Sequence, residues 1–290
     1  MDHPASTSTP TPPDARSLRY VAIIPALNEA ACIGRVVRQL TALRRSDGTR
    51  SFAAVVVGDN GSTDDTCAVA ASAGALIGRA SARGYGHGCM AAIRAAPVAD
   101  VYVFIDGDDT MNYADMELLL LAIETGAELV VGRRVHRARH SMSLAQRVGN
   151  ALCCGLIRLL WRANVHDLGP LRAVRTRTFA RLDMQALTYG WTLEMQIRTF
   201  ELQRTMIEVP VSTLARTTGA SKVSSNLRAA ARCGRVMLQT IFTLWVSRRR
   251  RMDAAAVSDV IAVTGSSNSG NDRSHTFHYP PPLLNKEIPP

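Results

Sequence analysis

The chain has 290 residues, of which 47% are hydrophobic and 20% are charged, a composition typical of a globular protein and not of a disordered one. Thirty-four Lys and Arg against 24 Asp and Glu give a net charge of +10, which favours anionic partners such as nucleic acid, lipid head groups or phosphorylated substrates. Aromatic residues make up only 5%, and no nucleic-acid-binding motif is recognised, so we expect no nucleic-acid partner.

The six cysteines form no CxxC pair, a pattern typical of reduced thiols in a cytoplasmic protein. The N-terminus lacks the apolar core of a secretory signal, and no apolar run reaches the ~20 residues that span a bilayer. We therefore expect a cytoplasmic protein. The alternative is peripheral contact with the inner face of an anionic membrane.

Residues 1–17 and the end of the chain are rich in Pro, Ser, Gly and Asn and predict disordered tails. The folded domain is expected over 18–247, with a donor-binding half of about 18–135 and an acceptor half of about 136–247. The tail of 248–290 opens with four arginines, Arg248 to Arg251. These are either a solvated basic end or a patch for anionic lipid.

The first half of the chain alternates apolar runs with amphipathic segments. Strands are predicted over 20–27, 52–60, 101–108 and 128–134, and helices over 29–43, 63–73 and 113–125. Because each strand is almost continuously apolar, helices should cover both faces of a mostly parallel, Rossmann-like sheet in an α/β fold. A capping sequence at Ser62 to Asp65 is expected to open the second helix.

The second half predicts a smaller mixed region. A helix over 144–161 carries six apolar residues on one face, which fits either a core helix or a membrane-surface helix with basic flanks. Strands are predicted near 171–174 and 206–211, followed by a long helix from about 224 to 246.

Polar residues follow the predicted strands directly. In a parallel sheet the carboxyl ends of the strands share one crevice, so these side chains should converge there. They are Asn28, Glu29, Asp59, Asn60, Asp106 and Asp108.

The strongest chemical signal is Asp106-Gly107-Asp108-Asp109 after the apolar run 101–105. Carboxylates crowded in this way repel one another unless a cation lies among them, and oxygen ligands suit Mg²⁺ or Mn²⁺. Such an ion could neutralise a diphosphate leaving group. The alternative is a solvated acidic turn.

The order of three motifs carries a resemblance: PALNE after the first strand, GDNGSTDDT after the second and DGDDT after the strand at 101–108. The chain resembles family 2 glycosyltransferases, and within them the dolichyl-phosphate and polyprenyl-phosphate mannosyl- or glucosyltransferases, from about Tyr20 to Val246. The resemblance implies the GT-A type nucleotide-diphospho-sugar transferase fold and a metal-dependent hexosyltransferase.

The resemblance also implies residue roles. Asp106 and Asp108 match the carboxylates that contact the metal and the diphosphate, and the remaining donor-binding positions match Pro25, Ala26, Asn28, Glu29, Asp59 and Arg133. A glycine-bearing loop of the family matches Arg83 to Gly88, where we expect a packing or donor-loop role.

Later segments resemble the acceptor side of the family. Arg172, Arg216 and Lys222 are expected to meet donor or acceptor phosphates, and Asp167 and Glu194 are the two candidate catalytic bases. A hydroxyl acceptor needs such a base, whereas a phosphate acceptor arrives ionised and needs none. With a phosphate acceptor, the two carboxylates would instead orient Arg172 or structure the pocket.

The predicted function is inverting transfer of a hexose from a UDP- or GDP-linked sugar to an acceptor, with polyprenyl phosphate as one candidate. Two alternatives remain open. A sugar nucleotidyltransferase has a similar sheet, but it begins with a Gly-rich loop and a basic residue that PALNEAACIG lacks. A non-catalytic sugar- or nucleotide-binding protein of the same fold would be expected to lose the metal carboxylates.

Overall fold

The computed structural model describes residues 18–135, 143–214 and 231–249. The expected tails at 1–17 and from 250 onward lie outside the described residues. The first compact unit of the chain ends at Trp245, and the fold is described for that unit.

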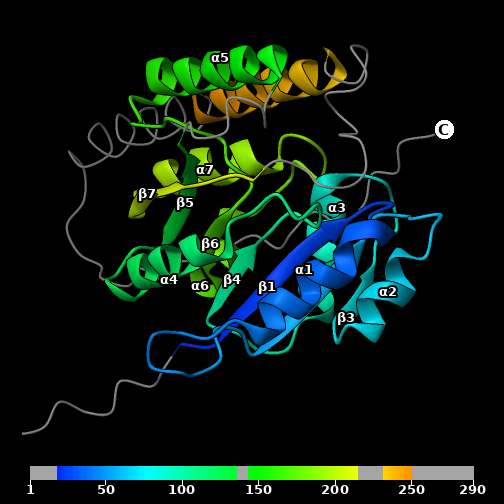
Figure 1. Cartoon of the computed structure of the whole chain (residues 1–290). Helices are drawn as coiled ribbons and strands as arrows, with labels where there is room; N and C mark the ends of the chain where they lie inside the picture. The colour runs from blue at the N-terminus through cyan, green and yellow to red at the C-terminus, as the bar shows by residue number, and fades with distance from the viewer. Residues whose placement is uncertain (1–17, 136–142, 215–230, 250–290) are drawn as a thin grey trace, which may run out of the picture. The chain divides into compact units, whose positions relative to one another are not determined.

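A seven-stranded sheet in the order β3-β2-β1-β4-β6-β5-β7 forms the centre of this unit (Figure 1). Its strands are β1 (Tyr20–Ala26), β2 (Ala54–Asp59), β3 (Leu76–Arg79), β4 (Val101–Phe104), β5 (Leu129–Arg134), β6 (Arg172–Arg175) and β7 (Met206–Val211). β6 runs antiparallel to both β4 and β5, and the other pairs are parallel. The mostly parallel α/β sheet predicted from the sequence is confirmed.

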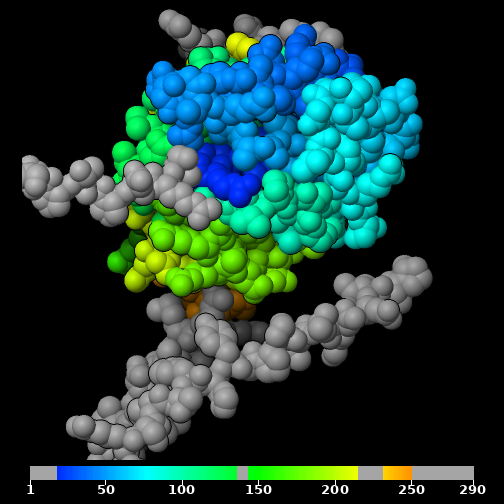
Figure 2. Space-filling model, turned by 90° about the horizontal axis from the view of Figure 1, so that it is seen from below, coloured from blue at the N-terminus to red at the C-terminus, as the bar shows by residue number. Residues whose placement is uncertain are grey.

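Helices cover both faces of the sheet. One apolar cluster joins the sheet to α1 (Ala30–Ala42), α2 (Thr66–Ser72) and α4 (Met116–Glu124). A second joins the other face to α3 (Tyr85–Ala95), α6 (Thr176–Leu182) and α7 (Trp191–Glu201). Figure 2 shows the blue and cyan N-terminal segments directly beside the green ones.

A third apolar cluster lies outside α7. It joins α7 to α5 (Leu144–Trp161) and to a helix over 231–249, which lie side by side in Figure 1. α5 thus packs in the core, but through Cys153, Cys154, Ile157 and Trp161. Four of the six apolar residues that were predicted to share one face of this helix are exposed instead: Leu144, Val148, Leu152 and Leu159. No helix among the described residues is long and apolar enough to cross a bilayer.

The predicted capping sequence Ser62 to Asp65 does precede α2, because Asp65 is the N-cap residue of that helix. The Asp65 side chain makes no cap hydrogen bond, and Asp64 Oδ1 instead accepts one from the Thr66 amide at 3.1 Å. One local expectation was wrong. The expected loop of residues 83–88 instead runs into α3 at Tyr85. Strand β3 was not predicted.

Close approach between α3 and β2 explains the glycine at position 58. A Cβ added to Gly58 would lie 1.9 Å from the Gly88 carbonyl oxygen, so only glycine permits this contact. The contact draws the start of α3 against the carboxyl end of β2, beside the site described below.

Gly58→Ala should destabilise the fold by roughly 1–3 kcal/mol, since α3 must move away from β2. Gly149→Ala in α5 is the matched control because its added Cβ meets nothing within 4 Å, and it should gain up to about 1 kcal/mol from helix propensity. Urea unfolding followed by circular dichroism measures both. Equal stabilities for the two variants would contradict the packing argument.

Candidate active site

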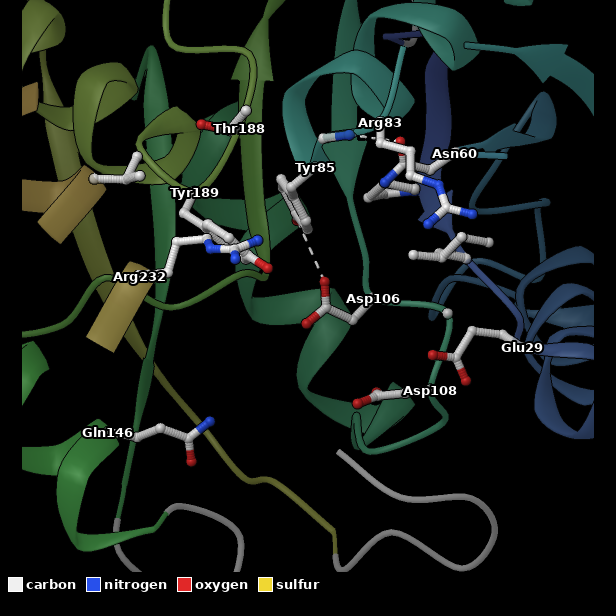
Figure 3. Close-up of a pocket in the computed structure, with 16 residues that line it drawn as sticks. Glu29, Asn60, Arg83, Tyr85, Asp106, Asp108, Gln146, Thr188, Tyr189 and Arg232 are labelled. Carbon is white, nitrogen blue, oxygen red and sulfur yellow. Dashed lines mark hydrogen bonds between the residues drawn. The ribbon is translucent and has the colours of Figure 1, made fainter. Parts of the chain in front are cut away.

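A pocket of about 670 Å³ opens at the carboxyl ends of β1, β2 and β4. Figure 3 shows its side chains converging from the two halves of the described domain. The polar and aromatic lining consists of Glu29, Asn60, Arg83, Tyr85, Asp106, Asp108, Gln146, Thr188, Tyr189 and Arg232. The predicted convergence at the strand ends is thus seen for Glu29, Asn60 and the two aspartates.

Asp106 follows β4 and faces the pocket centre (Figure 3). Burial away from water is the largest cause that raises the pKa of its carboxyl, and the negative charge of Asp108 is the next. Together they raise this pKa to about 7. The Tyr85 hydroxyl donates a hydrogen bond to its Oδ1 at 3.3 Å. A carboxylate with this pKa favours either a proton or a bound cation.

The turn after Asp106 is held by side chains. Asp108 Oδ1 accepts two hydrogen bonds from Thr110, one from the backbone amide at 3.3 Å and one from the side-chain hydroxyl at 2.7 Å. Asp109 has a positive φ of 56°, and its carboxylate meets Arg35 of α1 at 2.5 Å and the Tyr113 hydroxyl at 2.9 Å. The third acid of the motif therefore anchors the turn away from the pocket.

The two pocket aspartates fit a divalent cation. A cation would relieve the repulsion that raises the pKa of Asp106, and carboxylate oxygens are the ligands that Mg²⁺ and Mn²⁺ prefer. Within residues 18–135, 143–214 and 231–249, no cluster of three His, Cys, Asp or Glu side chains could hold a metal. Further ligands would have to come from water and from a substrate such as a diphosphate.

Only some of the residues expected to bind the donor after β1 and β2 line the pocket. Pro25, Ala26 and Glu29 line the pocket. Asn28 and Asp59 lie beside it without lining it: the Asn28 side chain accepts a hydrogen bond from the Thr63 amide at 2.8 Å, and Asp59 accepts one from Ser62 at 3.0 Å. Both side chains hold the loop after β2.

A second, basic pocket of about 600 Å³ is lined by α5, as the first is. Gln146 of α5 lines the first pocket and Arg147 lines the second. The charged and ionisable lining of the second pocket is Arg133, Arg134, Arg147, Arg158, His166 and Asp167. Arg133 was predicted to bind the donor, yet it lines this second pocket.

The comparisons with known proteins agree with this geometry. The family model described as "Glycosyl transferase family 2" matches residues 21–182. An uncharacterized glycosyltransferase of Mycobacterium tuberculosis is 34% identical over 72% of this chain and 91% of its own. The chain belongs to glycosyltransferase family 2.

Two further relatives of this family 2 chain have named activities. A dolichyl-phosphate hexose transferase of Haloferax volcanii is 30% identical over 65% of this chain and 80% of its own. An undecaprenyl-phosphate mannosyltransferase of Micrococcus luteus is 28% identical over 72% and 89%.

A solved structure supports the fold. Glucosyl-3-phosphoglycerate synthase of Mycobacterium tuberculosis, in complex with Mn²⁺ and uridine-diphosphate-glucose, has a TM-score of 0.62 at 22% identity over 78% of each chain. The expected GT-A fold is confirmed. The family assignment makes the chain a transferase that uses a nucleotide sugar.

One expected base of the transferase, Glu194, is misplaced for that role. It is 1% exposed and belongs to the core of α7. Its Oε2 accepts hydrogen bonds from the Gln185 amide at 2.9 Å and the Ala186 amide at 2.6 Å, and its Oε1 pairs with Arg198 at 2.8 Å. Glu194 therefore holds the loop that carries Thr188 and Tyr189 into the pocket, and it cannot reach a substrate.

The other expected base, Asp167, forms a two-oxygen pair with the Arg134 guanidinium at 2.6 and 2.9 Å. It also accepts a hydrogen bond from the Arg134 amide at 2.8 Å and is 4% exposed. Both oxygens of Asp167 are therefore engaged by Arg134 and not by the first pocket.

Arg172 lies beneath the site and not in it. Its side chain is fully buried and donates to the carbonyl oxygens of Thr192, Leu168 and Gly169. Burial lowers its pKa to about 10, which still leaves it charged at neutral pH. The expected direct contact with a phosphate is therefore wrong for this conformation. The other two expected phosphate ligands, Arg216 and Lys222, lie outside the described residues.

Several lining residues were not predicted as ligands. Gln146 and Arg232 come from helices whose sequences signal only amphipathicity, and no local pattern marks them as pocket residues. Tyr85 stands in the stretch that resembles the family's glycine-bearing loop, and Tyr189 stands in a segment that resembles another family element, so a signal existed for both.

Without added metal, Asp106→Asn should stabilise the protein at pH 8 by roughly 1–3 kcal/mol. Because the folded-state pKa of Asp106 is raised to about 7, the free energy of unfolding of the wild type falls as pH rises from about 4 to about 7. The Asp106→Asn variant has no carboxyl at this position, so its stability does not fall in this way. Thermal unfolding at pH 5 and pH 8 measures the difference. A smaller gain at pH 8 than at pH 5 would contradict the pKa argument.

Proposed function

We propose that the protein transfers a hexose, with inversion, from a UDP- or GDP-linked sugar to the phosphate of a polyprenyl phosphate. The acceptor class rests on one observation: within the described residues, neither expected catalytic base is available. Glu194 is enclosed in the core and Asp167 is paired with Arg134. A phosphate acceptor is already ionised at neutral pH and needs no base.

The first pocket is the proposed donor site. The pocket-lining residues Pro25, Ala26, Leu27 and Glu29 at the end of β1, and Asn60 after β2, would contact the base and ribose, while Asp106 and Asp108 would face the diphosphate. Arg83 and Arg232 lie on opposite sides of the pocket in Figure 3. Their guanidinium groups suit phosphate oxygens.

Asp106 and Asp108 would hold Mg²⁺ or Mn²⁺, which supplies neutralising charge to the diphosphate leaving group when it is bound. The Tyr85 hydroxyl, 3.3 Å from Asp106 Oδ1, would orient that carboxylate. Glu194 and Arg198 would keep Thr188 and Tyr189 against the sugar side of the pocket through the loop at 185–190.

The second pocket is the proposed site for the acceptor phosphate. Four arginines and one histidine line it against one carboxylate, so the pocket carries an excess of positive charge that favours an anion. The attacking oxygen would come from this side while the diphosphate leaves on the other, an arrangement that inverts the anomeric carbon. The two relatives named for dolichyl-phosphate and undecaprenyl-phosphate activity support this acceptor class.

The glucosyl-3-phosphoglycerate synthase structures hold a small phosphorylated acceptor, phosphoglyceric acid. Their resemblance to this chain, at 21% identity, concerns the fold. A soluble phosphorylated acceptor is therefore the competing outcome of an acceptor screen, with the same anionic chemistry. A cytoplasmic location of the protein, with peripheral contact at the inner face of the membrane, is part of the proposal.

Asp108→Asn should abolish metal-dependent donor binding, since one of the two carboxylates facing the diphosphate is lost. Calorimetry with UDP-glucose and GDP-mannose in Mn²⁺, Mg²⁺ or EDTA measures this binding. Asp115→Asn is the matched control because Asp115 does not line the pocket and instead accepts a hydrogen bond from the Ser212 amide at 2.5 Å. Unchanged donor binding by Asp108→Asn would remove the metal from the proposal.

Arg133→Ala and Arg147→Ala should each raise the KM for a polyprenyl phosphate by about tenfold, the loss expected from one charge-assisted phosphate contact. Donor affinity should stay unchanged, because neither residue lines the first pocket. Arg181→Ala, on the exposed end of α6, is the charge-matched control. Losses of donor affinity equal to those of acceptor affinity would place the second pocket in the donor site instead.

A further inference from the structure

The outer faces of two helices carry an unusual concentration of exposed apolar side chains. Leu144, Val148, Leu152 and Leu159 of α5 are between 52% and 75% exposed. Leu238 and Phe242 of the helix over 231–249 are 40% and 63% exposed. We call these six residues the outer face. The described residues include fifteen large hydrophobic side chains that are exposed, and six of those belong to this face.

The spacing of these residues makes each set continuous on its helix. Positions 144, 148, 152 and 159 fall within one narrow stripe at 3.6 residues per turn, and positions 238 and 242 are one turn apart. The opposite side of α5 buries Cys153, Ile157 and Trp161 in the cluster shared with α7. Ile241 and Leu244 of the second helix join that same cluster, so both exposed stripes point away from it.

The charge of the two helices is of one sign. Residues 143–162 and 231–249 contain no Asp or Glu, although the whole chain has 24. They carry seven arginines: Arg147, Arg158 and Arg162 in the first range, and Arg232, Arg235, Arg248 and Arg249 in the second. Arg248 is half-buried, and the other six are exposed. A surface that is apolar, basic and free of acids is complementary to an anionic bilayer.

We propose that the outer face of α5 and the helix over 231–249 docks on the surface of an anionic membrane. The leucines and Phe242 would enter the boundary between head groups and acyl chains, while the flanking arginines would meet lipid phosphates. If two copies of the chain met through this face, their arginines would repel one another. A second copy of the chain is therefore a poorer partner than an anionic membrane.

This surface extends the proposed function by naming its membrane partner. Arg147 and Arg158 flank the outer face and also line the second pocket. A docked helix would therefore hold the proposed acceptor-phosphate pocket close to the lipid head groups. A long polyprenyl chain could then stay in the bilayer while its phosphate enters the pocket.

The test is co-sedimentation of the full chain with phosphatidylcholine vesicles that contain or lack phosphatidylglycerol. Wild type should bind the anionic vesicles, and Leu152→Glu combined with Leu159→Glu should weaken that binding by at least about tenfold. Leu118→Glu with Leu121→Glu is the matched control, since these α4 leucines are 46% and 54% exposed and the charge change is the same. The control should bind like wild type.

Three results would overturn the proposal. They are equal binding to neutral and anionic vesicles, equal loss in both double variants, and a lipid-free dimer that the outer-face variant dissociates in sedimentation velocity. Circular dichroism and donor binding show that both variants are folded. Vesicle binding requires neither donor nor acceptor, so its failure is distinguishable from failure of the transfer reaction.

Discussion

Two opposite charges at the junction of β4 and β6 organise the site. Asp106 follows β4, and Arg172 pairs in register with Phe104, two residues earlier. Burial and the charge of Asp108 raise the pKa of Asp106, while the fully buried Arg172 contributes a positive charge that also acts on Tyr85 and Asp167. Since Arg172 is bonded to backbone carbonyls, its charge is fixed in place before any ligand arrives. Its positive charge lowers the pKa of Asp106, against the larger effects of burial and of Asp108.

The antiparallel strand β6 makes that arrangement possible. By running against both β4 and β5, it brings residues from the later part of the chain into the middle of the sheet. Asp167, just before this strand, reaches Arg134 at the end of β5, and α7 packs Trp191 against Phe104 with ring centroids 6.1 Å apart. The earlier and later parts of the sheet therefore share one core. Glu194 fixes the loop at 185–190 from within α7.

The sequence predicted the structure best where a buried apolar strand is followed directly by polar residues. Continuous apolar runs predicted β1, β2, β4 and β5, and the acidic turn after β4 predicted the centre of the pocket. β3 was missed because it is a four-residue edge strand with an exposed Leu76. The start of α3 was missed because its glycines weaken helix propensity; a Cβ on Gly86 would lie 2.6 Å from the Trp191 ring, a tertiary contact that the local sequence does not reveal. Glu194 and Arg172 were misjudged because residue type does not reveal whether a charge faces solvent, a ligand or the backbone.

Helix α5 joins features that the sequence treats separately. Its first turn places Gln146 in one pocket and Arg147 in the other, and its 18 residues extend for about 27 Å as one rod. A rod cannot shift at one end without moving at the other. If contact at the outer face shifts the helix, surface binding and pocket occupancy become thermodynamically linked, and that linkage is reciprocal. An enzyme built in this way would bind its substrates with a different affinity at a surface than in free solution.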